Sequence, residues 1–318
     1  MNTKPSNIPE CIKKQVPLDN KNWFRTGGKA EYFIEAKSIV DIKSAIRWAN
    51  NNTIPITIIG HGANILISDD GIQGLVVIVD LQSINHQNNI LTVDAGVSVD
   101  QTINYALNHN LGGLEFFTSI PGSIGGATCM NIHYFDALLS DYIQTIQMID
   151  LDSTEIIEVD RSWSNFGYNQ SKFLSKKYLI ISVTLKLNIL TDIKTAYAQG
   201  RSDEIRRQRS RRYPPARTCG SFFQNFSTDE YKHANGSTKI PHVAYYLESV
   251  GVKGQLSSGK ASVFSLHANM LTTEEGATSN DICTLARMMQ EKVDKKFGLW
   301  PKPECQILGF KQSPFIKT

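Results

Sequence analysis

A glycine-rich segment at residues 120–127, with the sequence Ile-Pro-Gly-Ser-Ile-Gly-Gly-Ala, has the composition of an anion-binding loop. Gly122, Gly125 and Gly126 have no Cβ atom, so the backbone there can adopt positive φ angles and approach a ligand closely. Successive amides of such a loop can converge on a diphosphate. A tight packed turn explains the same composition equally well. The segment taken alone leaves both interpretations open.

A second glycine-bearing segment, residues 60–65, follows the apolar run at residues 54–59. Gly60-His61-Gly62 begins like a dinucleotide-binding fingerprint. The third glycine is missing, however, and no clear helical pattern follows. The sequence therefore argues against a Rossmann fold and leaves a nucleotide-binding loop open.

Apolar periodicity predicts the elements that position these two loops. Strands are predicted over residues 54–59, 75–81, 91–95, 145–151, 155–159 and 178–187. Helices are predicted behind the capping pairs Ser38–Asp41, Ser98–Gln101 and Thr278–Asp281. Each glycine-bearing loop then lies at the end of an α/β unit.

Composition limits the class of protein. A chain of 318 residues that is 41% hydrophobic and 20% charged is long enough for two or three globular domains. A net charge of +3 does not indicate a nucleic-acid surface. Five widely spaced cysteines without a C-x-x-C pair predict a reducing cytoplasm. No apolar run approaches the ~20 residues of a membrane span, so no membrane partner is expected.

Two further patterns are assigned no chemistry. None of the seven histidines forms H-E-x-x-H or a comparable pair, so no metal site is predicted. The arginine-rich segment at residues 192–217 can be read as an anion or nucleic-acid patch. We interpret it as a solvated helical face that connects two domains.

A set of motifs resembles the UDP-N-acetylenolpyruvoylglucosamine reductase family. The motifs occur in one order over residues ~20 to 310. The motifs are Asn22-x-Phe24-Arg25-x-Gly27-Gly28, Gly60-x-Gly62-x-Asn64-Ile65-Leu66, Gly113-Leu114-Glu115-Phe116, Ile120-Pro121-Gly122-x-Ile124-Gly125-Gly126-Ala127-x-x-Met130-Asn131, Thr218-Cys219-Gly220-Ser221-Phe222-Phe223-x-Asn225, Ser265-x-His267-Ala268-Asn269 and Pro303-Glu304-x-x-Ile307-x-Gly309. Members of this family are flavoenzymes that make UDP-N-acetylmuramate for peptidoglycan. The short span at residues 173–201 is similar to the shorter form of the family, which lacks an extra tyrosine-bearing loop.

The resemblance implies an α+β fold. An FAD-binding domain of the vanillyl-alcohol-oxidase-like (PCMH) type, made of two α/β subdomains, would precede a C-terminal α+β substrate domain. The expected boundaries are a loosely held leader at 1–18, the FAD-binding domain at 19–190 with subdomains at about 19–82 and 83–190, an Arg-rich connector at 191–213, the substrate domain at 214–310 and a tail at 311–318.

The resemblance also implies the ligands and the site. FAD is the expected cofactor, NADPH the reductant and UDP-N-acetylglucosamine enolpyruvate the substrate, in a monomeric enzyme of the bacterial cytoplasm. Ser221 aligns with the serine that protonates the substrate carbanion, and Glu304 with the acidic residue at the enolate end. Tyr168 and Asn225 are expected to bind substrate. The residues expected around FAD are Gly60, His61, Gly62, Ala63, Asn64, Ile65, Ile120, Pro121, Gly122, Ser123, Gly125 and Gly126.

Departures from the family pattern fall mostly on the substrate side. Asn169 stands where the family has an arginine that faces the enolpyruvyl group, and Gln224 replaces a lysine. A neutral asparagine cannot give the charged bidentate grip of a guanidinium. The sequence therefore predicts an active reductase and keeps one alternative, a flavin-binding relative with degraded or redirected activity.

Overall fold

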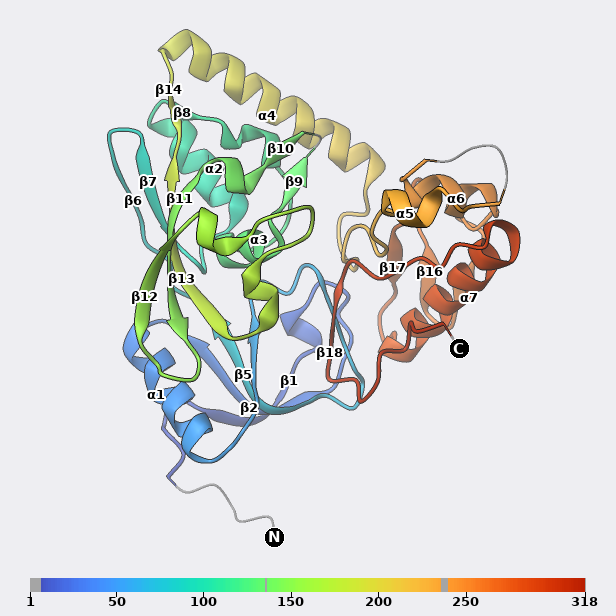
Figure 1. Ribbon diagram of the computed structural model, residues 1–318, viewed down its shortest axis with the longest axis horizontal. Coiled ribbons are helices and arrows are strands. Elements are labelled where there is room, and N and C mark those ends of the chain that lie inside the picture. Colours follow the sequence, from blue (N-terminus) through green and yellow to red (C-terminus); the bar gives the residue numbers. More distant parts are fainter. Residues whose placement is uncertain (1–6, 135, 236–239, 318) are drawn as a thin grey trace. The chain divides into compact units, whose positions relative to one another are not determined.

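The computed structural model describes residues 7–134, 136–235 and 240–317, so part of the predicted leader (1–6) and the end of the predicted tail (318) lie outside the described residues. The chain forms two compact units that are interleaved in sequence (Figure 1). Unit 1 consists of Met1–Val16, Ala30–His61 and Gln73–Arg209. Unit 2 consists of Pro17–Lys29, Gly62–Ile72 and Ser210–Thr318. The predicted domain boundaries stay predictions.

Helices and strands are mixed throughout the described chain. The α-helices are α1 Ile39–Asn51, α2 Val99–Asn108, α3 Ile124–Met130, α4 Asp192–Arg212, α5 Thr228–Tyr231, α6 Val243–Ser249 and α7 Ser279–Phe297. Short 3₁₀ helices are η1 Asp19–Lys21, η2 Leu114–Phe117, η3 Leu139–Asp141, η4 Ser162–Ser164 and η5 Lys172–Ser175. The strands are β1 Lys13–Pro17, β2 Lys29–Ala36, β3 Ile56–Ile59, β4 Ile65–Ile67, β5 Ile72–Val79, β6 Ile84–Gln87, β7 Ile90–Asp94, β8 Leu111–Gly112, β9 His133–Tyr134, β10 Ala137–Leu138, β11 Ile143–Asp150, β12 Ile156–Asp160, β13 Tyr178–Lys186, β14 Asn188–Ile189, β15 Ser257–Ser258, β16 Ala261–Val263, β17 Leu271–Thr273 and β18 Gln306–Leu308.

The first sheet has the strand order β1-β2-β5-β3, in which β3 and β5 run parallel. Helix α1 begins at the predicted cap, because the Ser38 side chain accepts a hydrogen bond from the Asp41 amide. Its apolar face, which includes Ile42 and Ile46, is fully buried. The prediction of a loosely held leader over residues 1–18 differs from the structure, since residues 13–17 form the edge strand β1.

The second sheet of unit 1 has the order β12-β11-β13-β7-β6, with every neighbouring pair antiparallel. Its register places Val183 opposite Val93 and Met148 opposite Ile180, all of which are buried. Helix α2 has the complete predicted capping box, in which the Ser98 hydroxyl and the Gln101 side chain each accept a backbone hydrogen bond. One continuous core joins the two sheets of this unit.

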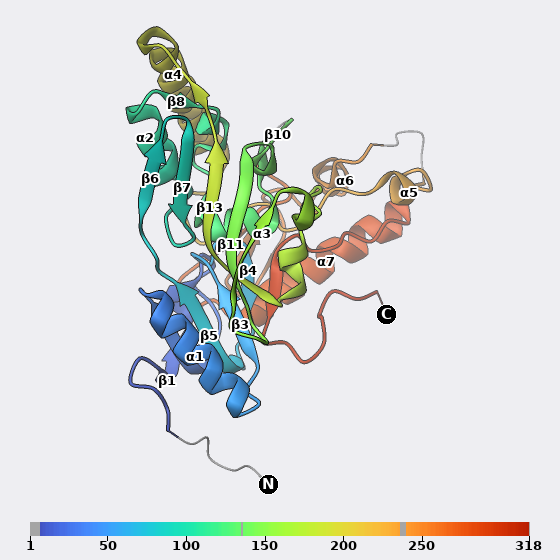
Figure 2. The same ribbon diagram turned by 60° about the vertical axis from the view of Figure 1, so that its left-hand side comes forward.

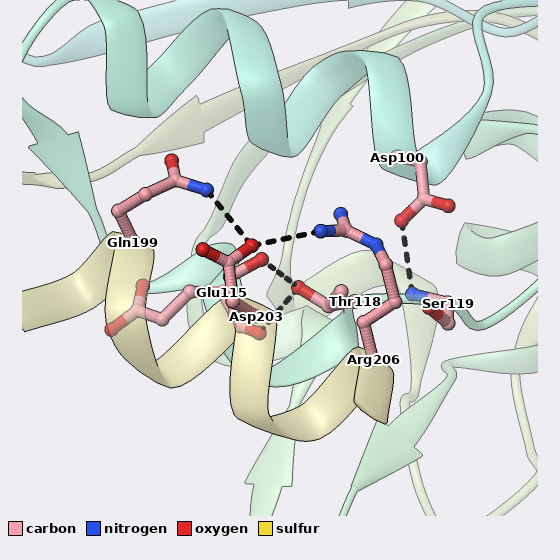
Figure 3. A network of polar contacts seen from close by, with 8 residues as sticks. Asp100, Glu115, Thr118, Ser119, Gln199, Asp203 and Arg206 are labelled. Atoms are coloured by element: carbon pink, nitrogen blue, oxygen red, sulfur yellow. Dashed lines mark hydrogen bonds and ion pairs between the residues drawn. The ribbon is translucent and has the colours of Figure 1, made fainter. Parts of the chain in front are cut away.

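Helix α4 is anchored to the segment that precedes the glycine-rich loop. The buried Glu115 carboxylate accepts a hydrogen bond from the Gly113 amide at 2.6 Å and pairs with the Arg201 guanidinium at 3.1 Å. The Thr118 hydroxyl donates to the Glu115 carbonyl oxygen (Figure 3). It also lies 2.7 Å from the Ser202 hydroxyl. The prediction of a helix over the arginine-rich segment is confirmed, and most of its arginines are exposed.

Unit 2 is built around helix α7, which lies beside the β15-β16-β17 sheet (Figure 1). The predicted capping box of Thr278 with Asp281 is present, and Gly298 ends the helix in the left-handed conformation. Phe222, Tyr246 and other fully buried side chains form its core. Among the described residues, no helix has the length and hydropathy needed to span a membrane. The α+β fold class is thus confirmed.

Candidate functional site

Loop 120–127 ends as the first turn of helix α3. Ser123 is the N-cap, and its hydroxyl accepts a hydrogen bond from the Gly126 amide at 3.3 Å. The Gly125 amide donates to the Ala95 carbonyl oxygen, and a Cβ atom at Gly125 would lie 2.8 Å from the Ala95 side chain. Glycine is required there because helix α3 packs directly on the end of β7.

The two predicted glycine segments meet inside unit 1. A Cβ atom at Gly60 would lie 2.6 Å from the Ser123 hydroxyl and 3.7 Å from the Gly126 backbone. The His61 imidazole fixes the segment at residues 60–65, because its Nε2 atom donates to the Gly96 carbonyl oxygen at 2.9 Å. The family resemblance implies that both segments surround one cofactor, and in the structure Gly60 lies against Ser123 and Gly126.

The turn before helix α3 presents backbone donors. Gly122 has a φ angle of +131°, which favours glycine, and its carbonyl oxygen accepts a hydrogen bond from the Val99 amide. The amides of Gly122 and Ser123 donate no hydrogen bond to the residues that the structure describes. A Cβ atom at Gly126 would meet only the Ser123 hydroxyl, at 3.5 Å. Open space beside donor amides fits a diphosphate group.

The C-terminal end of helix α3 holds the turn that carries Asn169. The Asn131 side chain donates to the Gly167 carbonyl oxygen at 2.9 Å, and the Ser171 hydroxyl donates to the Cys129 carbonyl oxygen at 2.6 Å. Asn169 has a φ angle of +49°, and its Nδ2 atom is buried without a hydrogen-bond partner among the described residues. Helix α3 therefore connects the glycine-rich loop to the position of the family arginine. An unpartnered buried donor is a group that a ligand can satisfy.

Tyr168, predicted to bind substrate, is 48% exposed. Its ring lies 4.7 Å from the His133 ring, centre to centre. Burial lowers the pKa of His133 below its ordinary value, so the neutral imidazole is favoured at pH 7. The Arg209 guanidinium lies over the ring of Tyr134, 5.8 Å from the ring centre. The His133 ring therefore lies beside the turn that carries Asn169.

Unit 2 holds residues 62–65, the remainder of the second glycine-bearing segment. Gly62 has a φ angle of +68°, and a Cβ atom there would lie 2.2 Å from the Lys21 carbonyl oxygen. Strand β4 follows and pairs in parallel with β18, with Ile65 opposite Gln306. The Asn64 Oδ1 atom is buried, and no residue that the structure describes donates a hydrogen bond to it. This segment therefore lies beside the stretch that begins with Glu304.

Ser221 and Glu304, 83 positions apart in sequence, lie on neighbouring segments of unit 2. The Glu304 amide donates to the Phe222 carbonyl oxygen at 2.7 Å. Both side chains are partly buried. In the described part of the chain the Ser221 hydroxyl makes no hydrogen bond, so its proton is available to a ligand. The two predicted catalytic residues are thus brought together.

Asn269 holds the serine-bearing segment, a role that the sequence analysis missed. Its side chain accepts a hydrogen bond from the Phe223 amide at 2.9 Å and donates to the Phe223 carbonyl oxygen at 2.7 Å. Its carbonyl oxygen accepts from the Phe222 amide. His267, expected to have a structural role, accepts from the Asn269 amide through Nδ1. The sequence signal for this role was the motif Ser265-x-His267-Ala268-Asn269, which contains both residues.

Cys219 precedes the serine and is buried. Burial, the neighbouring Cys305 thiol and the Glu304 carboxyl raise the pKa of Cys219 well above its ordinary value. The protonated thiol is therefore the stable form at neutral pH and is a poor nucleophile. Burial, followed by the charge of Arg212, lowers the pKa of His267. Neither group competes with Ser221 as the nearby proton carrier.

The remaining predicted contacts have partners of their own. The Asn225 Oδ1 atom accepts a hydrogen bond from the Val243 amide at 3.1 Å, which leaves its Nδ2 atom for a ligand. The Lys172 ammonium, three positions after Asn169, lies over the Trp163 ring, 4.3 Å from its centre. Lys172 therefore already has an aromatic partner within unit 1.

Comparisons with known proteins show which family this chain is similar to. Residues 30–160 match the family model described as FAD binding domain, and residues 212–308 match that of the UDP-N-acetylenolpyruvoylglucosamine reductase C-terminal domain. The UDP-N-acetylenolpyruvoylglucosamine reductase of Listeria innocua is 31% identical over 97% of this chain and 99% of its own length. That of Clostridium botulinum is 31% identical over 92% and 91%. The crystal structure of the Thermus caldophilus reductase aligns with a TM-score of 0.77 at 21% identity, covering 94% of this chain and 99% of the other.

Proposed function

The chain belongs to the UDP-N-acetylenolpyruvoylglucosamine reductase family, and on that premise we propose that it reduces UDP-N-acetylglucosamine enolpyruvate to UDP-N-acetylmuramate. It is a flavin-dependent oxidoreductase that uses FAD and NADPH. The observation that carries the proposal is the approach of the Ser221 and Glu304 segments beside Asn64. Nothing in the comparisons favours the alternative of a flavin-binding relative with degraded or redirected activity. We place the enzyme in the bacterial cytoplasm as a monomer.

The residues present fit FAD. The Gly122 and Ser123 amides, with the open face of Gly126, would hold the diphosphate, and Gly60 is required beside them. The buried, unpartnered Oδ1 atom of Asn64 can accept a hydrogen bond from the cofactor. The bound flavin, reduced by NADPH, supplies a hydride to the enolpyruvyl double bond.

Ser221 completes the reduction. Hydride addition leaves electron density on the substrate carbon next to the carboxylate, and the Ser221 hydroxyl donates a proton to that carbon. Solvent then returns a proton to the serine oxygen. Glu304 would lie at the enolate end of the substrate, which is the position that the family resemblance gives to its acidic residue. Asn225 and Tyr168 would orient the UDP-sugar through the Nδ2 atom and the phenol.

One experiment tests the function. The purified protein should be yellow and should oxidise NADPH faster when UDP-N-acetylglucosamine enolpyruvate is added. The stimulation is followed at 340 nm, and UDP-N-acetylmuramate is identified by mass spectrometry. A yellow protein without substrate-stimulated NADPH oxidation would support the degraded-activity alternative. A colourless protein that cannot be reconstituted with FAD would contradict both functions.

We predict that Asn169→Arg raises kcat. A charged bidentate donor in place of one neutral Nδ2 atom can restore up to ~3 kcal/mol of transition-state stabilisation, which is about 10²-fold. The same change costs about 1 kcal/mol of folding stability, because Asn169 has a φ angle of +49° and asparagine tolerates the left-handed region better than arginine. Steady-state kcat and the urea midpoint measure the two effects.

Asn165→Arg is the matched control for this prediction. Asn165 also belongs to unit 1, has a φ angle of +47° and is exposed. The control should lose stability by a similar amount without any gain in kcat. An unchanged or lower kcat in Asn169→Arg would mean that the site has been rebuilt around asparagine.

A further inference from the structure

Two histidines that are 23 positions apart in sequence meet on the surface of unit 1. His86 lies on the edge strand β6, and His109 is the residue that ends helix α2. Figures 1 and 2 both show β6 beside α2. Both side chains are exposed, and their ring centres are 4.4 Å apart. The reduction reaction uses neither residue.

Tyr105 orients both imidazoles. The His109 Nδ1 atom lies 2.8 Å from the Tyr105 carbonyl oxygen, and a carbonyl oxygen only accepts, so Nδ1 carries the proton. The Nε2 atom of neutral His109 is therefore unprotonated, and its lone pair is available to a ligand. The His86 Nδ1 atom lies 3.1 Å from the Tyr105 hydroxyl. A hydrogen bond that fixes Nδ1 and leaves Nε2 open is the usual support of a metal-ligating histidine.

The ring separation matches two ligands of one metal ion. Two imidazoles bonded through nitrogens at about 2.1 Å place their ring centres about 4.5 Å apart when the N–metal–N angle is a right angle, and about 5.2 Å apart when it is tetrahedral. The observed 4.4 Å agrees with the right angle. Right-angle coordination by imidazole is typical of Ni²⁺ and Cu²⁺.

The C-terminal end of helix α2 provides an electrostatic field that favours a bound cation. His109 caps the C-terminus, where the last carbonyl groups carry partial negative charge that attracts a cation. Within the described ranges, no group of three or more histidine, cysteine, aspartate or glutamate side chains could hold a metal ion. Two imidazoles and water molecules would therefore make up the coordination shell.

We propose that His86 and His109 form a binding site for a first-row divalent transition-metal ion, positioned by Tyr105. The ion would bridge the edge strand β6 and the end of helix α2. Because that bridge exists only in the folded chain, metal binding should raise the melting temperature. The sequence could not show this site, since the two residues share no motif.

Titration of the whole protein with Ni²⁺ tests the proposal. Calorimetry should give one ion per chain with a dissociation constant in the micromolar range. His86→Gln and His109→Gln should each weaken binding at least tenfold. Tyr105→Phe should weaken it less, because that variant keeps the carbonyl contact to His109 and loses only the hydroxyl contact to His86.

His233→Gln is the control, because His233 is an exposed histidine of unit 2. It should bind Ni²⁺ like the unmodified chain. Melting temperatures measured with EDTA should be equal for all variants, which shows that the fold persists. Added Ni²⁺ should then raise the melting temperature only where both His86 and His109 remain. Equal Ni²⁺ affinity in His109→Gln and the unmodified chain, or no binding up to about 1 mM, would overturn the proposal.

Discussion

Replacing Ser221 by alanine should lower kcat by about 10²- to 10⁴-fold, the range by which a positioned proton donor accelerates a reaction. Ser221 is partly buried on the segment that pairs with the Glu304 segment, and its hydroxyl makes no hydrogen bond to a described residue. The substituted chain keeps the backbone bonds that hold this segment to Asn269. The loss should therefore come from the missing proton alone.

The two half-reactions separate this role from a structural one. NADPH should still bleach the flavin absorbance of Ser221→Ala at the normal rate, because that step needs no proton from serine. Recovery of the absorbance after addition of UDP-N-acetylglucosamine enolpyruvate should be slow. Ser257→Ala, a change at an exposed serine of the same unit, is the control and should behave normally in both steps. Normal recovery in Ser221→Ala would show that another group delivers the proton.

Elements with a local signal were predictable from the sequence. Helices α2 and α7 begin at their predicted capping boxes, because a serine or threonine three residues before a glutamine or aspartate satisfies the first free amides. Strands β11 and β13 were predicted within three residues of their observed ends, because β11 mixes buried apolar with exposed polar residues and β13 is a mostly buried apolar run. Local chemistry determines these boundaries, so one sequence suffices to find them.

Strand β1 had no such signal. Four of its five residues are exposed, so its sequence Lys-Lys-Gln-Val-Pro shows no apolar alternation. Backbone pairing at the edge of the first sheet makes it a strand. An edge strand without a buried face depends on its neighbour, and this information lies elsewhere in the chain.

The candidate site depended on distant pairings in the same way. Motifs supplied Ser221, Glu304 and Asn64, but only the β4–β18 pair and the bond from the Glu304 amide to Phe222 show that their segments are neighbours. Asn131 and Asn269 were part of quoted motifs without an assigned role. Their function is to hold backbone of other segments, which spacing alone does not reveal.

Substitution of the two adjacent glycines of helix α3 should affect different properties, FAD affinity at Gly126 and folding stability at Gly125. Gly126→Val should give a folded, colourless protein whose affinity for FAD is at least 10²-fold weaker. A Cβ atom at Gly126 meets only the Ser123 hydroxyl, at the ordinary distance of 3.5 Å, so the chain itself has room for a side chain. The valine methyl groups would occupy the space that we assign to the diphosphate.

Gly125→Ala should instead reduce stability. Its Cβ atom would lie 2.8 Å from the Ala95 side chain and 3.1 Å from the Ala95 carbonyl oxygen, so helix α3 would have to move from β7. Overpacking of this kind costs about 1–3 kcal/mol, which a urea titration of the flavin-free protein measures.

Gly200→Ala on helix α4 is the control for both changes, because nothing lies within 4 Å of its Cβ position. Alanine there should raise stability by up to about 1 kcal/mol and leave FAD binding unchanged. The ratio of absorbance at 450 and 280 nm reports FAD content, and quenching of flavin fluorescence reports affinity. Full FAD content in Gly126→Val would contradict the diphosphate site. Loss of FAD with normal stability would instead show that the glycine-rich segment binds the cofactor and is not only a tight packed turn. Composition alone left these two interpretations open.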